Sequence, residues 1–329
     1  VITTNKLEAR YKLNNKIKII GPNIKFKNIK SRYPKYFFCL FYLAKFLILN
    51  KPSLVFSFQA NSYASIVSRF LKTNIITRSN SSSVGWSKNK IKVFLYKIFL
   101  SIPNEVIVNS YEFKKELDKK FNIKTSVIYN PLNKKEIIKK SKEKTDLKFY
   151  KKGHLKLINV GRLVDQKDQI TILKAINLIK NRLNFKLLII GRGKDKPKLE
   201  LFINQNKLSR FVKIIPFQKN PYKYMNKADL FILSSKFEGL PNILLEAQYL
   251  KKYIISTNCE TGPKEILLNG EAGDLISIGD YKKLSFLIKN YHKRKKIIKK
   301  KISIGTKNFY RFDYKLNCDK YLKFIKNNE

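Results

Sequence analysis

The sequence predicts an α/β protein with two Rossmann-like domains. Short apolar runs alternate with longer amphipathic stretches, which is the pattern of parallel strands connected by helices. Two such series flank a polar, lysine-rich stretch at residues 134–154, whereas one continuous sheet would need about ten strands, which is less common. The chain has 329 residues, 43% of them hydrophobic, which suits two domains of about 150 residues each.

The first series of apolar runs predicts the strands of an N-terminal domain that spans residues 1–145. The sequence begins VITT, which is typical of the end of a strand, so we expect this domain to lack its first strand. The remaining predicted strands are KIKII (16–20), SLVFSF (53–58), NIITR (74–78) and EVIVNS (105–110).

The second series predicts a C-terminal domain that spans residues 146–310. Apolar residues recur at three and four positions in 169–183, which predicts a helix there. We expect residues 311–329 to pack back on the N-terminal domain. The predicted strands are KLINVG (156–161), KLLIIG (186–191), VKIIPF (212–217), DLFILS (229–234) and YIIST (253–257).

The charge of the chain is extreme, with 70 Lys and Arg against 23 Asp and Glu and a formal net charge of +47. An AT-rich genome explains part of it, because Asn and Ile are abundant too. The distribution is also uneven, since no acidic residue occurs between Glu8 and Glu105. A basic surface of this kind attracts polyanions, which include anionic lipid, nucleic acid and phosphorylated substrates.

Two segments of this acid-free region are candidates for contact with a membrane. No run of about 20 apolar residues occurs, so a spanning helix is not expected. Residues 36–49 suit a core or interfacial helix, and residues 88–103 mix Lys with Val, Phe, Leu and Ile, as interfacial helices do. We expect an anionic membrane surface as a partner. The alternative is that both segments are core helices.

Cysteine and histidine usage argues against disulfides and metals. Cys39, Cys259 and Cys318 are far apart and form no CxxC pair, which indicates a reducing compartment. His154 and His292 have no metal-ligand neighbours at useful spacing, and no Asp-x-Asp occurs. We therefore expect neither a metal nor a cofactor.

The loops that follow the predicted strands carry the chemistry, because ligands of open parallel sheets bind beyond the carboxyl ends of the strands. In GRLVDQK, Gly161 allows close approach of a ligand, and Arg162 and Lys167 suit a diphosphate. Both side chains lie on a loop, where we expect them to contribute little packing. The alternative is that they are solvated surface charges.

The stretch SSKFEGLPNILLEAQ, residues 234–248, predicts a loop and the start of a helix. Pro241 suits the first turn, and the backbone N–H groups from Gly239 to Asn242 make an anion site. Glu238 precedes the helix and Glu246 follows about one turn inside it, where either carboxylate can accept hydrogen bonds from sugar hydroxyls. The alternative is that both are ordinary helix-start acids.

These loops resemble those of retaining GT-B glycosyltransferases of family 4, the glycosyl transferases group 1. The resemblance rests on GRLVDQKDQ, GRGKDKPKLE, SSKFEGLPNILLEA and NCETGPKEILLNGEAGDL in that order, and on the Glu-x7-Glu pair. It covers residues 155–280 closely and the first half loosely, through SFQANSYAS, ITRSNSSSVGWSKN and VIVNSYEFKKEL. It implies two domains that face each other across a cleft.

The resemblance also implies a role for each site residue. Arg162 and Lys167 would bind the donor diphosphate in place of a metal, Glu238 would support the transition state at the transferred sugar, and these three would be catalytic. Glu246 would bind the ribose, and Phe217 would flank the base. The further residues implied at the donor are Gly161, Gly239, Leu240, Pro241 and Asn242.

The implied reaction is retaining transfer of a hexose or N-acetylhexosamine from a nucleotide sugar, expected to be a UDP-sugar. The acceptor would be a glycan or an undecaprenyl-linked glycan, and the enzyme would act at the inner face of the cytoplasmic membrane in bacterial O-antigen, capsule or lipopolysaccharide synthesis. The alternatives are a nucleic-acid-binding protein, for which no recognised module occurs, a hydrolase or epimerase of the same fold, and a non-catalytic sugar-nucleotide binder.

Two features depart from the family pattern. The glycine-rich loop after the first strand is not found, and the loop that often carries a His reads SFQANSY, with Gln59 and Asn61 instead. Arg78 and Ser79 are the other candidates on the acceptor side.

Overall fold

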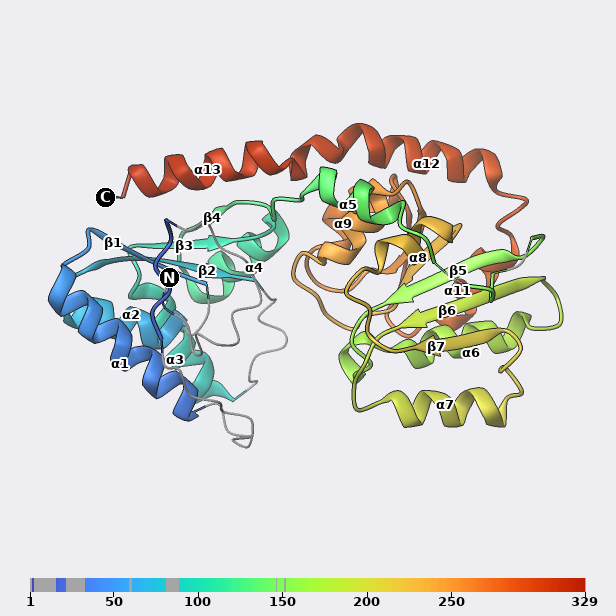
Figure 1. Ribbon diagram of the computed structural model, residues 1–329, viewed down its shortest axis with the longest axis horizontal. Coiled ribbons are helices and arrows are strands. Elements are labelled where there is room, and N and C mark those ends of the chain that lie inside the picture. The colour runs from blue at the N-terminus through green and yellow to red at the C-terminus, as the bar shows by residue number, and fades with distance from the viewer. Residues whose placement is uncertain are drawn as a thin grey trace.

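The computed structural model describes residues 2, 16–21, 33–58, 61–80, 89–145, 147–150 and 152–328. It contains two parallel sheets in separate halves of the molecule, each flanked by helices (Figure 1). The four-stranded sheet has the order β1-β2-β3-β4, and the six-stranded sheet has the order β10-β9-β8-β5-β6-β7. The prediction of an α/β protein with two parallel sheets is confirmed.

The N-terminal sheet connects its strands in simple sequence. All neighbours pair in parallel, and α1, α2, α3 and α4 form one layer in which consecutive helices contact each other. The strands are β1 (Leu54–Ser57), β2 (Asn74–Ser79), β3 (Glu105–Val108) and β4 (Thr125–Val127). The helices are α1 (Tyr33–Asn50), α2 (Asn61–Phe70), α3 (Lys90–Ser101) and α4 (Tyr111–Phe121).

Two predictions for this sheet are wrong. Residues 16–20 form no strand, since Ile20 makes only an isolated bridge to Ile2 and residues 16–19 are turn and coil. The strand β4 was missed, because a run of three residues, Thr-Ser-Val, shows no periodicity. The expected loss of a first strand stays a prediction.

The C-terminal sheet is wound in two directions from its centre. The chain runs outward from β5 to β6 and β7, then returns to β8 beside β5 and continues to β9 and β10. A ligand is expected where the direction reverses, between β5 and β8. The strands are β5 (Leu155–Val160), β6 (Phe185–Ile190), β7 (Val212–Ile215), β8 (Leu230–Leu233), β9 (Tyr253–Thr257) and β10 (Asp274–Ile276). All but β10 match the predicted strands.

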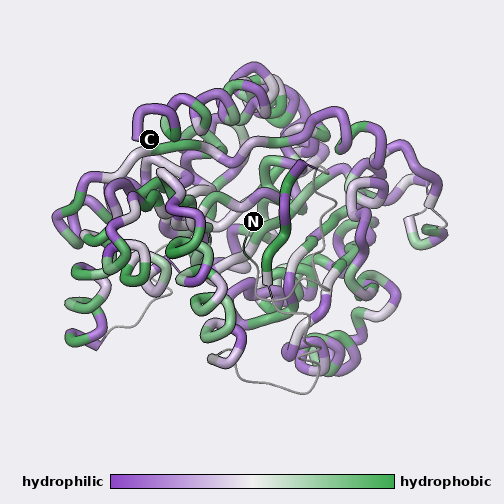
Figure 2. The backbone as a smooth tube through the Cα atoms, turned by 60° about the vertical axis from the view of Figure 1, so that its left-hand side comes forward, coloured by the Kyte–Doolittle hydropathy of each residue, from purple (hydrophilic) through white to green (hydrophobic). Residues whose placement is uncertain are grey.

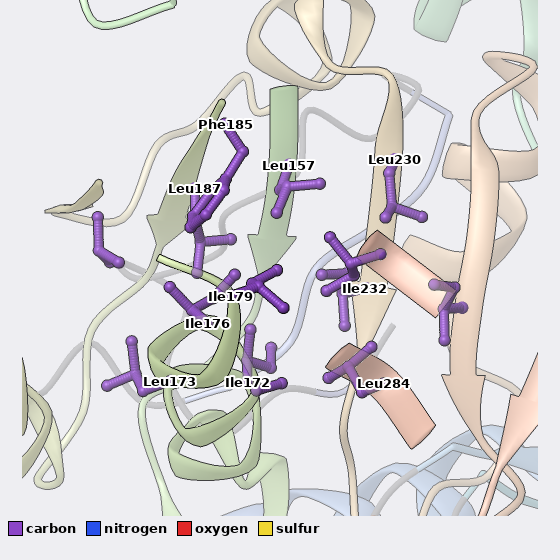
Figure 3. Packing of buried hydrophobic residues seen from close by; sticks show 14 of the residues in the cluster. Leu157, Ile172, Leu173, Ile176, Ile179, Phe185, Leu187, Leu230, Ile232 and Leu284 are labelled. Atoms are coloured by element: carbon purple, nitrogen blue, oxygen red, sulfur yellow. The ribbon is translucent and has the colours of Figure 1, made fainter. Parts of the chain in front are cut away.

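Side chains from alternate positions of these strands enter two cores, one on each face of the sheet. On one face, α6 (Gln169–Ile179) buries Ile172, Ile176 and Ile179 against Leu157 and neighbouring strand residues (Figure 3). The predicted helix is confirmed, although it ends at residue 179 rather than 183. The other helices of this face are α7 (Lys196–Gln205), α11 (Tyr281–Lys289) and α12 (Lys295–Lys307).

The second core lies on the opposite face, under helices that lead into the site. Leu244 and Leu245 of α9 and Met225 of α8 pack there against Ile158 and Phe231 of the sheet. The helices on this side are α5 (Lys134–Ser141), α8 (Tyr222–Lys227), α9 (Asn242–Tyr249) and the short α10 (Pro263–Ile266). Hydrophobic segments occur in inner strands and also along outer helices (Figure 2).

Two segments connect the halves of the molecule. Helix α5 packs on α8, where Asn226 Nδ2 donates a 3.2 Å hydrogen bond to Ser141 O. Helices α12 and α13 (Tyr314–Lys326) run along one side of both sheets (Figure 1), and Tyr321 and Phe324 pack on the N-terminal sheet. The domain limits 1–145, 146–310 and 311–329 stay predictions.

Candidate active site

The loops after β5 and β6 interlock at the carboxyl edge of the C-terminal sheet. Gly161 N donates to Ile190 O at 3.0 Å, and a Cβ on Gly191 would lie 1.9 Å from Gly161 O. Only glycine fits at position 191, and the close approach of Gly191 fixes the position of the backbone at Gly161. The chain then turns through a short 3-10 helix (Asp165–Lys167), which brings the Lys167 side chain back toward the loop after β8.

Lys167 and Glu238 form an ion pair at the centre of this edge. Their side chains are only 15% and 8% exposed, and Ser235 Oγ donates a 2.6 Å hydrogen bond to the same oxygen, Oε1, of Glu238. A buried carboxylate needs such partners to offset its desolvation. The sequence assigned these two residues to different parts of a ligand, and the structure places them in direct contact.

Arg162 lies beside this pair but keeps its guanidinium in solvent. Its Nη2 donates to Gln166 Oε1 at 2.9 Å. The sequence analysis did not single out Gln166. Its side-chain Nε2 also donates to Phe237 O at 2.8 Å, and its backbone carbonyl accepts from Lys236 N at 2.8 Å. Gln166 therefore joins the loops that carry Arg162 and Glu238.

Residues 238–242, here called the 238–242 segment, are supported from the loop after β9. Thr261 Oγ1 donates to Glu238 O at 2.6 Å. Gly262 has φ +84°, and a Cβ there would lie 1.8 Å from Gly239 O. The left-handed backbone and the close contact both require glycine at this position.

The helix after this segment begins one residue later than predicted, at Asn242, with Pro241 as its N-cap. Proline has no backbone N–H, so the prediction of a continuous row of donors from Gly239 to Asn242 is wrong at Pro241. Leu240 and Pro241 are buried, whereas Asn242 is exposed.

Glu246 lies on the second turn of α9 in a partly buried position. Tyr222 Oη donates to its Oε1 at 3.1 Å. Burial raises the pKa of Glu246 to about 7, an effect that the Tyr222 hydrogen bond reduces. The carboxyl is thus poised to change its charge near neutral pH, and additional donors would favour its ionised form.

Phe217 is exposed just beyond β7, with the guanidinium of Arg192 5.2 Å from its ring centroid. Strand β7 is two strands from β5, so this ring lies roughly 10 Å from the centre of the site along the sheet edge. Phe217 and Lys167 are therefore separated by about two strand spacings along the carboxyl edge of the sheet.

On the acceptor side, two predicted residues are held by bonds within the chain. Asn61 Nδ2 donates to Arg78 O at 2.9 Å, and Ser57 Oγ donates to Asn61 Oδ1 at 3.0 Å. The Arg78 guanidinium lies over the ring of Tyr321, 5.6 Å from its centroid. Ser79 ends β2 in a half-buried position. Gln59 lies outside the described residues.

Asn130, which the sequence analysis missed, connects Arg78 to the 238–242 segment. Its Oδ1 accepts from Arg78 Nη2, while its Nδ2 donates to Asn242 Oδ1 and, at 3.3 Å, to Leu240 O. Asn130 follows β4, so the missed strand also hid this loop. Had β4 been predicted, the position after its carboxyl end would have been the signal.

Two parallel-sheet domains, joined by a returning C-terminal helix and carrying charged loops at the strand ends, define the GT-B class of glycosyltransferase. The structure is similar to HepE of Anabaena in complex with UDP-glucose, with a TM-score of 0.76, 16% identity, and coverage of 88% of this chain and 82% of that one. It is also similar to sucrose-phosphate synthase of Thermosynechococcus elongatus, with a TM-score of 0.79, 13% identity, and coverage of 99% and 87%.

The chain belongs to the glycosyl transferases group 1 family, whose model matches residues 139–304. An uncharacterized glycosyltransferase of Methanocaldococcus jannaschii is 32% identical over 66% of this chain and 58% of its own length. An N-acetylgalactosaminyltransferase of Campylobacter jejuni that acts on a diphospho-undecaprenol is 28% identical over 71% and 62%. The alignments thus span about three fifths of these curated relatives.

Proposed function

We propose that this chain transfers a sugar from a UDP-sugar to a glycan or lipid-linked acceptor in bacterial surface polysaccharide synthesis, with retention of anomeric configuration. The observation that carries the proposal is the buried Lys167–Glu238 pair beside Arg162, at the point where the sheet reverses direction. Related proteins of capsule and lipopolysaccharide synthesis, and the UDP complex of HepE, support it.

The site offers charge of the kind that this reaction requires. A nucleoside diphosphate leaves with additional negative charge, which the solvent-facing Arg162 and the neighbouring Lys167 would stabilise. When Lys167 turns to the diphosphate, the Glu238 carboxylate becomes available to the transferred sugar, whose transition state carries positive charge. Among the described residues, no group of three or more His, Cys, Asp or Glu could hold a metal ion, and metal independence stays a prediction.

The test is a transfer assay with a panel of UDP-sugars and an undecaprenyl diphosphate-linked acceptor, run with and without EDTA. We expect transfer that survives EDTA and an α-linked product from an α-linked donor. Release of free sugar alone would identify a hydrolase, and nucleotide binding without turnover would identify a binder. An inverted product, or loss in EDTA with rescue by Mg²⁺ or Mn²⁺, would contradict the mechanism.

A first prediction concerns Glu246, because the ionised carboxylate that would bind the ribose is less favourable for the folded chain than the protonated form. Its pKa is about 7 in the folded chain, against an ordinary value of 4.5. The stability that accompanies the protonated carboxyl is therefore fully present below pH 4.5 and is lost as the pH rises through 7. We expect Glu246→Gln to melt at a higher temperature than the wild type at pH 8 and at a similar temperature near pH 4.5.

The same variant is expected to bind UDP-glucose roughly 10-fold more weakly at pH 8, because a neutral amide replaces a charged acceptor of ribose hydroxyls. Calorimetric titration measures this affinity. Glu271→Gln, at an exposed carboxylate, is the control and should change neither property. Unchanged melting and affinity in Glu246→Gln would show that Glu246 neither strains the fold nor binds the ribose.

We further propose that helices α1, α2 and α3 lie on an anionic membrane. Each carries exposed apolar side chains at helical spacing, and no residue of α3 is fully buried. No helix among the described residues is both long and apolar enough to cross a membrane. The exposed apolar side chains are Phe37, Phe41, Ile48, Leu49, Tyr63, Ile66, Phe70, Ile91, Phe94, Leu95 and Ile98.

The partner is inferred from charge as well as apolar area. Lys45, Lys90, Lys92 and Lys97 are exposed among these side chains, and no acidic residue occurs between positions 9 and 104. Each basic residue near an anionic leaflet contributes about 1 kcal/mol. The alternative, that both segments are core helices, holds in part, because α1 buries Leu43 and Leu47 and because Val93, Tyr96 and Leu100 of α3 pack against the N-terminal core.

Liposome sedimentation tests this second prediction. We expect binding to phosphatidylglycerol vesicles, little binding to phosphatidylcholine vesicles, and weaker binding as salt rises. Replacing Lys90, Lys92 and Lys97 by Gln should weaken it further; Lys88, the fourth lysine of this segment, lies outside the described residues. The matched control replaces three exposed lysines of α12, namely Lys296, Lys299 and Lys300. Equal binding to both vesicle types, or equal loss in both triple variants, would contradict the proposal.

A further inference from the structure

Two glutamates from different domains each occupy the N-terminus of a helix in the other domain. Helix α4 of the N-terminal domain begins after Ser110, whose Oγ accepts from Phe113 N at 3.1 Å. The first two backbone N–H groups of α4, those of Tyr111 and Glu112, donate to the Glu265 carboxylate of α10, both at 3.0 Å. In return, Glu112 Oε2 accepts from Gly262 N, the N-cap of α10, at 2.9 Å.

This crossed pair places two carboxylates close together. Burial and, secondarily, the charge of Glu265 raise the pKa of Glu112, so the arrangement has an electrostatic cost. The cost is offset by backbone N–H donors that a helix start leaves without intrahelical partners, and by Tyr129 Oη, which donates to Glu265 Oε1 at 2.5 Å. All these partners are available only while the two domains are in contact.

The pair leads directly to the 238–242 segment. Gly262, which Glu112 holds, packs against the carbonyl of Gly239, and the preceding Thr261 donates to Glu238 O. The N-terminal domain therefore reaches the backbone of Glu238 through Glu112 and a single turn of chain. A shift of Gly262 would move the carboxylate that the proposed reaction places at the transferred sugar.

We propose that Glu112 and Glu265 are positioning residues that make the shape of the 238–242 segment depend on closure of the two domains. The inference rests on the proposed function for its kinetic consequence. A chain with the domains apart would hold the segment loosely, so productive donor geometry would form only when the acceptor domain is docked. Misplacement of a reacting group by about 1 Å can cost 10²-fold in rate.

The kinetic test uses Glu112→Ala, Glu265→Ala and the double variant, with Glu200→Ala, at an exposed glutamate of α7, as the matched control. We expect each single variant to lose roughly 10-fold or more in kcat/KM and the double variant to lose no more than the worse single, because both act through one contact. Glu112→Gln keeps an acceptor oxygen and should recover part of the activity. Additive losses, or kinetics equal to those of Glu200→Ala, would overturn the proposal.

Hydrogen exchange provides a readout that needs no turnover. In Glu112→Ala we expect faster exchange in peptides that cover Gly262 and also in those that cover 238–242, with melting close to that of the wild type. Unchanged exchange at 238–242 would overturn the proposal even if activity fell. If the wild type transfers no sugar at all, the proposed function fails while this measurement still decides the link between the domains.

Discussion

Arg162→Ala is expected to reduce turnover about 10²-fold or more while leaving the fold intact, the scale of losing one preorganised charge donor. The guanidinium is exposed and makes one hydrogen bond, to Gln166, so its removal leaves no buried group without a partner. Steady-state kinetics with the donor of the wild type measures the effect, and a thermal melt checks the fold.

The matched control for this variant is Arg210→Ala. Arg210 is also exposed, but it precedes β7 and therefore lies at the amino ends of the strands, away from the site at their carboxyl ends. Its replacement should leave turnover unchanged. Near-normal transfer by Arg162→Ala would show that the diphosphate binds elsewhere.

Lys167→Ala is a less clean variant than the sequence suggested. The expectation that its side chain contributes little to the fold is revised, because Lys167 is 15% exposed and pairs with the still more buried Glu238. Removing one partner of a buried ion pair leaves an uncompensated charge and is strongly destabilising. A loss of activity in this variant therefore has to be compared with its loss of stability.

Glu238→Gln is expected to lower kcat by about 10²- to 10³-fold, the range for a preorganised electrostatic group at the reacting centre. The amide has nearly the same size and can still accept the hydrogen bonds from Ser235 Oγ and Lys167 Nζ, so it disturbs the packing less than Glu238→Ala would. Because Lys167 loses its charged partner, a thermal melt has to accompany the kinetics. What is lost is the negative charge that would face the positively charged transition state.

Asp165→Asn supplies the comparison for this second variant. Asp165 lies in the neighbouring loop, exposed and paired with Lys236 at 2.6 Å. The same chemical change there should alter kcat little. If both variants lost turnover equally, net charge rather than the position of Glu238 would explain the effect.

The C-terminal domain was predictable because its signals are local. Strands such as β6 and β8 are mostly buried on both faces and therefore form nearly continuous apolar runs. The loop after each strand is charged and in most cases contains glycine. The missed strands β4 and β10 have three residues each, too few to show a period, and the loss of β4 concealed Asn130. A functional residue in a loop could thus be located only where the strand before that loop was long enough to be recognised.

The contacts of the site could not be predicted in the same way. Glu112 and Gly262 are far apart in the sequence, and their hydrogen bond depends on how two domains meet rather than on any local pattern. The pairing of Lys167 with Glu238 likewise follows from how the loops after β5 and β8 pack together. Residue types showed which chemistry was available, whereas the fold decides which groups share a hydrogen bond.

The order in which the chain is made differs from the order in which its first sheet is completed. Ile107 and Ile128 of the N-terminal half are covered by Tyr321 and Phe324 of α13. A ribosome that adds 5 to 20 residues per second needs roughly 10 to 40 s to make the 190 or so residues between Ile128 and α13. Throughout that interval the nascent sheet lacks the helix that covers this face, so the domain synthesised first is the last to be finished.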